Sequence, residues 1–257
     1  MSIRRIGIIG LLICLPWLLL AAEDRLEKPI RFAPLPMEGR KILHEQFFGL
    51  IRYLQQAVDR PIELVDFDDY GELLQAFRDG DVDLAYLGPL PYALLAKSDE
   101  DVEPVVCFRE ADGQSLYTCS LVAAGSSRIN LATDQGLHIG LTQPLSTCGY
   151  LGVSRMLQTM GRHLDDPGIR YSYAGSHTAA TLGVLQGVYD LAGVKTSVAE
   201  RYRHLDLQTL AVSRPFPGLG LYANRRELDA DLIERMRQAL LKIDPTNPAF
   251  DRSQVEA

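Results

Sequence analysis

Two hydrophobic patterns alternate along the chain from residue 29 onward. Short apolar runs, which are typical of buried strands, are followed by stretches whose apolar residues recur every three or four positions, as in amphipathic helices. In the first part of the chain the expected strands are 30–36, 61–67 and 82–88, and the expected helices are 39–58, 70–80 and 91–98. Strands that alternate with helices in this way predict a parallel sheet with right-handed crossovers.

A second set of the same kind follows a strand at 117–124, which is long enough to lead from one part of the protein to another. Its expected strands are 137–142, 169–175 and 189–195, and its expected helices begin at 149 and 177. The segment 207–228 is expected to return to the first part, where the helix 229–243 closes the fold. We therefore expect an α/β protein with two Rossmann-like lobes and a ligand cleft between them. The expected boundaries are 23–118 plus 213–257 for lobe 1 and 119–212 for lobe 2.

The first 22 residues have the pattern of an export signal. Arg4 and Arg5 precede an apolar run that ends at Ala22, and charged residues follow. This order predicts a signal peptide, whereas an uncleaved N-terminal membrane anchor is the alternative. The run is short for a membrane span and contains Pro16. With either interpretation the body of the protein is expected outside the cytoplasmic membrane, in the periplasm.

The composition is that of an ordinary globular protein. The chain has 257 residues, of which 47% are hydrophobic and 23% charged, and its formal net charge is -7. This charge, without a run of Lys or Arg, argues against nucleic acid as a partner. No spacing of metal ligands stands out, so we expect neither a metal nor a cofactor, and we expect a monomer.

Three cysteines follow the leader: Cys107, Cys119 and Cys148. Cys107 and Cys119 enclose a segment that reads as strand, Asp-Gly turn and strand. A hairpin of this kind could bring the two sulfur atoms within bonding distance, and an oxidising compartment would permit the bond. A Cys107–Cys119 disulfide and two buried free thiols remain equally open, and Cys148 is expected to be unpaired.

A cluster of small polar residues lies between a strand and a helix. Ser146, Thr147 and Cys148 follow the apolar run that ends at Leu141, and an apolar helical pattern begins after Gly149. A simple N-cap needs one such side chain. Several donors at the point where helical N–H groups lack partners predict an anion-binding site, with a capped helix as the alternative.

Further polar residues follow other strands. His177 opens a helix, where the helix dipole favours its neutral, donating form, although a lone His is often structural. A Gly-Pro turn directs Tyr86 or Tyr92 outward, unless both pack in the core. The loop 34–40 and Lys195, which could simply be solvated, follow strands too. Ligands of open α/β sheets bind beyond the carboxyl ends of strands, so these residues predict one cleft with hydroxyl, imidazole and ammonium donors.

Four segments together resemble the phosphate, phosphite and phosphonate substrate-binding proteins of ABC transporters. They are "GDVDLAYLGPLPYALL", "STCGYLGVSRML", "GSHTAATLGVLQGVYDLAGVKTSVAERY" and "SRPFPGLGLYANRRELDADLIERMRQALLKID". The resemblance covers residues 29–244 in the order and spacing of that family. It implies a type II periplasmic binding fold, whose two lobes close on a ligand.

The resemblance also implies a set of ligand-binding residues. Members of the family hold the phosphonate group at a helix N-terminus rich in Ser and Thr, and they add a His and an aromatic residue. The matching positions are Ser146, Thr147, Cys148, the N–H of Gly149, His177 and Tyr92.

Two positions depart from the family pattern. Cys148 replaces the usual Ser or Thr, and its thiol is a weaker donor than a hydroxyl. Lys195 replaces the acidic or amide residue of aminophosphonate binders. A lysine there would repel an ammonium group, so we expect a purely anionic ligand.

These observations lead to one main hypothesis and two alternatives. The main hypothesis is a non-catalytic protein that binds a small phosphorus oxyanion or an organophosphonate for an ABC permease. An uncleaved anchor and the change at Lys195 would favour a ligand sensor that docks on a membrane signalling receptor. A hydrolase with Ser146 or Cys148 as nucleophile and His177 as base is disfavoured, because the serine is not in a Gly-x-Ser-x-Gly turn.

Overall fold

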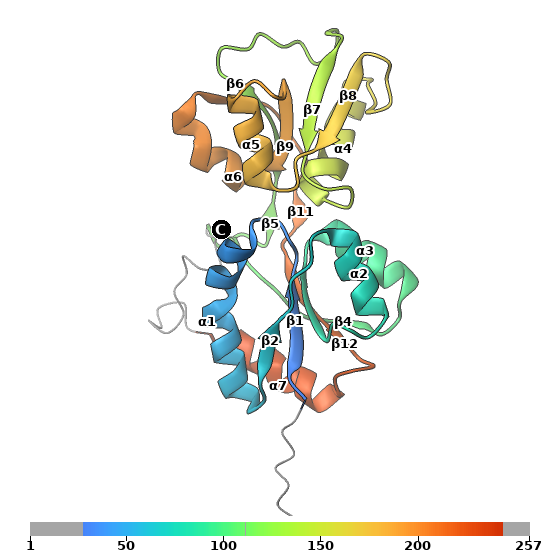
Figure 1. The fold of residues 1–257 in the computed structure, drawn as a ribbon, viewed down its shortest axis with the longest axis vertical. Coiled ribbons are helices and arrows are strands. Elements are labelled where there is room, and N and C mark those ends of the chain that lie inside the picture. Colours follow the sequence, from blue (N-terminus) through green and yellow to red (C-terminus); the bar gives the residue numbers. More distant parts are fainter. Residues whose placement is uncertain (1–27, 111, 244–257) are drawn as a thin grey trace, which may run out of the picture.

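The protein folds into two α/β lobes that are stacked along its long axis (Figure 1). The computed structural model describes residues 28–110 and 112–243, so the predicted leader at 1–22 lies outside the described residues. Within the described ranges, no helix combines the length and the apolar character that crossing a bilayer requires.

Lobe 1 is built on a five-stranded sheet with the strand order β2-β1-β3-β12-β4. β1 pairs in parallel with β2 and β3, whereas β12 is antiparallel to β3 and β4. Its strands are β1 (Ile30–Pro34), β2 (Ile62–Leu64), β3 (Leu84–Leu87), β4 (Val102–Cys107) and β12 (Gly220–Asn224). Its helices are α1 (Arg40–Val58), α2 (Tyr70–Arg78), α3 (Pro89–Ser98) and α7 (Ala230–Leu241).

The core of lobe 1 has two layers because its central strands are buried on both faces. On β1, Phe32 belongs to a cluster with residues of α1 and α7, and the next residue, Ala33, belongs to a cluster with residues of α2 and α3. Successive side chains of a strand point to opposite faces, so the sheet is covered by α1 and α7 on one side and by α2 and α3 on the other.

Lobe 2 repeats this architecture with the strand order β10-β6-β9-β7-β8. β7 pairs in parallel with β8 and β9, and β6 runs antiparallel to β9 and β10. Its strands are β6 (Cys119–Ala124), β7 (Leu137–Leu141), β8 (Ile169–Tyr173), β9 (Leu191–Lys195) and β10 (Leu207–Val212). Its helical segments are η1 (Thr147–Gly152), α4 (Val153–Thr159), α5 (His177–Leu185), α6 (Thr196–Tyr202) and η2 (Arg203–Leu205).

The chain crosses between the lobes twice, and the two crossing segments pair with each other. β5 (Leu116–Tyr117) and β11 (Phe216–Pro217) form an antiparallel two-stranded sheet, which lies between the lobes in Figure 1. On the lobe 2 side, the Cys119 N–H donates to Ser213 Oγ at 2.9 Å, and the Ser213 N–H donates to the Cys119 carbonyl at 2.8 Å. This paired connection is the hinge region.

The strands and helices that the hydrophobic pattern predicts are present, with one notable change at a helix start. The helix expected from residue 149 begins at Thr147 as a π-helical turn, in which the Leu151 N–H donates to the Ser146 carbonyl at 3.2 Å. π-Helical turns are rare and are frequent at functional sites.

Neither alternative left open for Cys107 and Cys119 is found, and the expectation that Cys148 is unpaired is wrong. The disulfide joins Cys119 to Cys148, and Cys107 is a free, exposed cysteine. The segment between Cys107 and Cys119 does not form a hairpin that pairs the strands on either side of it. β4, which ends at Cys107, pairs with β12 in lobe 1, whereas β6, which begins at Cys119, pairs with β9 and β10 in lobe 2. The two cysteines therefore belong to different sheets.

Candidate functional site

A small buried cavity lies where the two lobes meet the hinge region. Its volume is about 20 Å³. Helix N-termini of both lobes contribute to its wall, because Tyr70, Thr147 and His177 are the first residues of α2, η1 and α5. The wall consists of Leu35, Met37, Tyr70, Gly88, Tyr117, Ser146, Thr147, Cys148, His177, Lys195 and Leu219.

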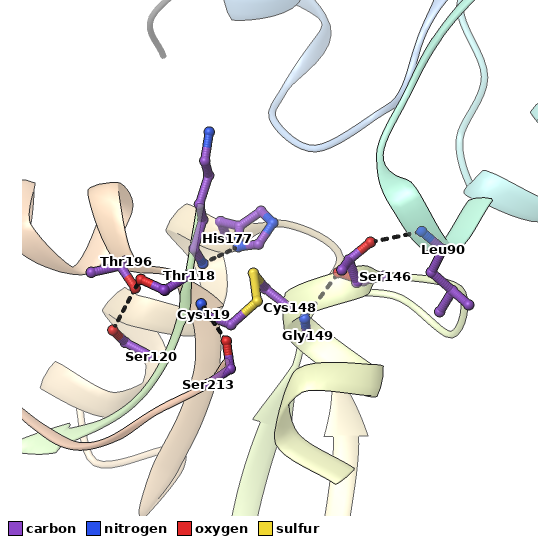
Figure 2. The surroundings of a disulfide bond; sticks show 12 residues. Leu90, Thr118, Cys119, Ser120, Ser146, Cys148, Gly149, His177, Thr196 and Ser213 are labelled. Carbon is purple, nitrogen blue, oxygen red and sulfur yellow. Dashed lines mark hydrogen bonds between the residues drawn. A yellow bond between two sulfur atoms is a disulfide. The ribbon is translucent and has the colours of Figure 1, made fainter. Parts of the chain in front are cut away.

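Ser146 caps the π-helical turn, and its hydroxyl group lies at the cavity. Its Oγ accepts a hydrogen bond from the Gly149 N–H at 2.9 Å (Figure 2). Its side chain is also hydrogen-bonded to the Tyr70 hydroxyl of lobe 1. The close approach of Thr142 requires glycine at 149, because a Cβ there would lie 2.0 Å from Thr142 Oγ1. The turn after β7 is thus shaped to place Ser146 at the cavity.

Thr147 connects the same turn to lobe 1 and to the hinge region. Its Oγ1 accepts a hydrogen bond from the Leu90 N–H of α3 at 3.1 Å, and its side chain is hydrogen-bonded to Tyr117 of β5. Burial raises the pKa of both Tyr70 and Tyr117 well above the usual range. Both phenols therefore stay neutral and can donate at any physiological pH.

His177 supplies a neutral imidazole. Its Nδ1 accepts a hydrogen bond from the Lys195 N–H at 3.2 Å, which leaves Nε2 to carry the ring proton. Burial, together with the positive charges of Lys195 and Arg201, lowers the pKa of His177 to about 3. The ring is a neutral N–H donor at neutral pH, as the sequence predicts for a His at the start of a helix.

Lys195 does not present an unpaired charge. Its Nζ lies 2.7 Å from a carboxylate oxygen of Glu110, and it lies 5.1 Å from the centre of the Tyr117 ring. Glu110 follows β4, on the far side of the hinge region from Lys195. The ion pair consequently balances the positive charge that the sequence places beside the cavity.

A larger cavity of about 830 Å³ adjoins the small one. The residues that line both are Met37, Tyr117, His177, Lys195 and Leu219. Tyr86 lines the larger cavity but not the small one, and its ring packs edge-on against the rings of Phe47 and Phe108. The two cavities share a wall, so a group that extends from the small cavity would enter the larger one.

Gln143 links the lobes through a buried amide. Its Oε1 accepts a hydrogen bond from the Tyr70 N–H at 3.0 Å, and its Nε2 donates to the carbonyl oxygens of Pro36 and Gly175, both at 2.9 Å. Tyr70 and Pro36 belong to lobe 1, whereas Gly175 belongs to lobe 2. These bonds, with the Ser146 and Thr147 contacts above, hold the lobes in a closed arrangement.

A second contact between the lobes involves a titratable group, the carboxylate of Glu38. Thr178 of α5 donates to a carboxylate oxygen of Glu38 at 3.1 Å, and the His177 N–H donates to the Met37 carbonyl at 3.4 Å. Burial raises the pKa of Glu38. The loop 34–40 therefore belongs to the site, as its place after the first strand predicts.

Three of the residues singled out in the sequence do not have the expected roles. The sulfur of Cys148 is bonded to Cys119, so it has no thiol hydrogen to donate. The Gly149 N–H already donates to Ser146 Oγ. Tyr92 lines neither cavity and instead stacks on Tyr222, with ring centres 4.2 Å apart.

Four residues of the site were not found from the sequence: Tyr70, Tyr117, Gln143 and Glu110. Tyr70 occupies an apolar position of an amphipathic helix, and Tyr117 lies in a short strand, so each resembles a core residue. The signal for Gln143 was its place directly after β7, one of the strands whose ends form the cleft.

In the part of the chain that the structure describes, His177 is hydrogen-bonded to the Lys195 N–H and not to the Ser146 hydroxyl. Among the same residues, no group of three or more His, Cys, Asp or Glu could hold a metal ion. The chemistry that this geometry supports is hydrogen bonding to an enclosed anion.

Comparison with known proteins identifies relatives of this chain. The family of periplasmic substrate-binding proteins of phosphonate ABC transporters matches residues 32–255. The phosphate-import protein PhnD of Mycolicibacterium smegmatis is 25% identical over 170 residues, which are 63% of this chain and 53% of that protein. The chain thus matches about half the length of this relative.

Solved structures share the fold. PhnD1 from Prochlorococcus marinus in complex with methylphosphonate gives a TM-score of 0.77 at 17% identity, over 89% of this chain and 88% of that one. A binding protein component of an ABC phosphonate transporter from Pseudomonas aeruginosa gives 0.78 at 22% identity, over 90% and 80%. These likenesses confirm the predicted two-lobed fold. Since the family match extends over most of the sequence, the chain belongs to the family of periplasmic substrate-binding proteins of phosphonate ABC transporters.

Proposed function

We propose that the protein captures a small phosphorus oxyanion or an organophosphonate outside the cytoplasmic membrane and delivers it to an ABC transporter. The observation that carries this proposal is the small cavity between the lobes. Hydroxyl groups of Ser146, Thr147, Tyr70 and Tyr117 and the neutral imidazole of His177 surround it. These five side chains are hereafter called the anion-binding site.

The chemistry of these donors suits an oxyanion of phosphorus. Hydrogen bonds to a charged acceptor are stronger than bonds between neutral groups, so an anion can replace the contacts that the hydroxyls now make with one another. A hydroxyl oxygen can also accept a hydrogen bond, which allows a partly protonated anion to bind. The role of Cys148 as a donor is not part of this proposal, because its sulfur is in the disulfide.

The cavity volumes favour a compact ligand. A volume of about 20 Å³ is close to what a single water-sized probe occupies, so a phosphorus oxyanion, which is larger, enters this site only when the lobes open. The substituent of an organophosphonate would extend past Lys195 and His177 into the cavity of about 830 Å³. We therefore expect compact anions such as phosphite, phosphate and methylphosphonate to bind.

The proposed mechanism is binding to lobe 2 followed by closure. An anion first contacts Ser146, Thr147 and His177, which all belong to lobe 2. Rotation at the hinge region then brings Tyr70 and the Leu90 N–H of lobe 1 onto the ligand side of the site. Closure of this kind around a ligand is a common transition of hinged two-lobed proteins.

Further parts of the proposal concern the whole molecule. We propose that lobe 1 comprises 23–118 plus 213–257 and that lobe 2 comprises 119–212, which the pairing of strands into separate sheets supports. We also propose a periplasmic monomer that is exported by, or anchored through, residues 1–22. Genes for a permease and an ATPase beside this gene would support transport, whereas a gene for a signalling receptor would favour a sensor.

Thermal unfolding with a panel of anions tests the proposal. A ligand that binds the folded state at about 100 times its Kd stabilises it by roughly 2.7 kcal/mol. We expect stabilisation by phosphate, phosphite or methylphosphonate, and less by sulfate, and isothermal titration calorimetry then gives the Kd. If no phosphorus anion raised the melting temperature, the proposed function would be wrong.

A further inference from the structure

The Cys119–Cys148 disulfide lies between the hinge region and the anion-binding site (Figure 2). Cys119 is the first residue of β6, where the chain enters lobe 2, and its backbone is bonded to Ser213 of the returning segment. Cys148 is the second residue of η1, directly after Thr147. Both cysteines are buried, with 0% and 3% of their surface exposed.

The turn that carries Cys148 is wider than an ordinary helical turn. In η1 the Leu151 N–H reaches back five residues to the Ser146 carbonyl, a wider turn than that of an α-helix. Within the turn, the Ser146 side chain that caps Gly149 belongs to the anion-binding site as well. The Ser146 oxygen can keep this bond while the O–H donates to an anion, so the direction in which the hydroxyl points depends on the geometry of the turn.

The hinge end of the disulfide is well fixed. Cys119 exchanges two hydrogen bonds with Ser213, and next to it the Thr118 carbonyl accepts a bond from the Thr196 N–H at 2.9 Å. The hydroxyl of Thr196 is also within hydrogen-bond distance of those of Thr118 and Ser120, at 2.8 and 2.9 Å. The covalent bond therefore ties a wide turn to a strand that is held from both sides.

We propose that the Cys119–Cys148 disulfide is a positioning element of the anion-binding site. It holds the π-helical turn at a set position relative to the hinge region, so that Ser146 and Thr147 are already in place when the lobes close. Without the bond, the turn must be ordered each time an anion binds, and the affinity falls. This inference rests on the proposed function, because it concerns the same site.

The test compares three forms of the full chain at a temperature well below their melting temperatures. The Kd values of methylphosphonate and phosphate are measured by calorimetry for the wild type, for the double variant Cys119→Ala/Cys148→Ala and for Cys107→Ala. Amide hydrogen exchange of residues 146–152 is followed without ligand. We expect the double variant to bind at least roughly tenfold more weakly and to exchange faster in this segment, because ordering the turn then opposes binding. The Cys107→Ala control should match the wild type in both.

The outcomes separate this inference from the proposed function. If the wild type binds neither anion, the proposed function is wrong and the inference is wrong with it. If the double variant melts at a lower temperature but keeps the wild-type Kd and exchange rates, the disulfide has a stabilising role alone and the inference is wrong. Should the double variant not fold, native wild-type protein is reduced with dithiothreitol, which breaks the S–S bond, yields two thiols and forms the cyclic disulfide of the reagent. A tenfold higher Kd after reduction supports the inference, and an unchanged Kd overturns it.

Discussion

The two lobes have the same architecture, yet they meet the cavity with chemically different helix ends. In lobe 2, η1 and α5 are capped by the neutral residues Ser146 and Ser176, and neither has an acidic residue in its first turn. In lobe 1, α2 is capped by Asp69 and carries Glu72 in its first turn. Carboxylates at a helix N-terminus neutralise the partial positive charge that would otherwise attract an anion.

The second helix end of lobe 1 is also poor in donors. α3 begins with Pro89, and Pro91 follows, so the Leu90 N–H is the donor that remains in this turn, and it is bonded to Thr147. Under the proposed function, this difference favours lobe 2 as the lobe that binds the anion and lobe 1 as the lobe that encloses it. A fold that is repeated need not repeat its chemistry, because capping residues decide what each helix end can bind.

The largest expected effect is that of the serine cap at the cavity. We expect Ser146→Ala to weaken binding of a phosphorus anion by about 2–3 kcal/mol, or roughly 30- to 150-fold in Kd, because a hydroxyl bonded to a charged ligand is lost. Calorimetry with methylphosphonate measures it. Ser176→Ala is the matched control, since Ser176 caps α5 by accepting from the Ala179 N–H and lines neither cavity. If both variants lost the same amount of binding affinity, the idea that Ser146 binds the ligand whereas Ser176 only caps a helix would be wrong.

A pH dependence of stability follows from His177. Its pKa is about 3 in the folded protein, against 6.5 for an ordinary histidine, so the unfolded chain binds more protons between these pH values. Stability is therefore full above about pH 6.5 and falls as the pH decreases toward 3, with a loss of about 2 kcal/mol between pH 7 and pH 5.

Urea unfolding at pH 7, 6 and 5 measures this loss. In His177→Gln the fall in stability should be smaller by about the same 2 kcal/mol. His204→Gln, which changes an exposed histidine, is the control. If the stability of the His177→Gln variant fell with pH as much as that of the wild type, a group other than His177 would cause the pH dependence.

The variant Gln143→Ala tests whether closure of lobe 1 onto lobe 2 contributes to ligand binding. Replacing Gln143 by Ala removes the acceptor of the Tyr70 N–H and the donor to Pro36, so we expect binding to weaken by about 1–2 kcal/mol, or roughly tenfold. The ligand-free protein should also have a larger radius of gyration in small-angle X-ray scattering. Gln208→Ala is the matched control, because the amide of Gln208 bonds to Ala124 and Ser127 within lobe 2. A Gln143 variant as compact and as tight-binding as the control would refute the role in closure.

The smallest expected effect is a gain. Glu110→Gln removes the partner of Lys195 and leaves a positive charge beside the cavity. We expect a two- to fivefold lower Kd for a doubly charged anion, about 0.5–1 kcal/mol, and a steeper weakening of binding with salt. Glu200→Gln removes a carboxylate from the larger cavity that pairs with Arg203 instead, and it should change the Kd little. If Glu110→Gln weakened binding, the ion pair itself would be needed for the site.

The sequence predicts the fold well because its pattern is local. The three parallel strands of each sheet are each followed by a helix, and this order predicts the parallel part of both sheets. Ser146 and His177 were found for the same reason, since a strand end that opens a helix is visible in the sequence. The prediction that Tyr92 binds the ligand fails because its stacking partner, Tyr222, lies far along the chain. The packing of the two rings depends on where β12 enters the sheet.

The disulfide could not be predicted from the sequence for a related reason. Cys107 and Cys119 are near in sequence, but the hinge region separates them into different sheets, whereas Cys148 reaches Cys119 through the packing of η1 on β6. Tyr70 and Tyr117 likewise look like core residues in their own segments. They reach the cavity because the lobes close on each other, which no local pattern reveals.

The position of β12 has a consequence for the order in which the protein can fold. β12 lies between β3 and β4 in the first sheet, but the chain reaches it after all the strands of lobe 2. During synthesis, β3 and β4 therefore exist with their shared neighbour missing, and the first sheet cannot be completed from the N-terminal half alone. Lobe 2 is contiguous and has no such dependence. A chain that must cross a membrane before folding would thus remain without a finished lobe 1 until its C-terminal part arrives.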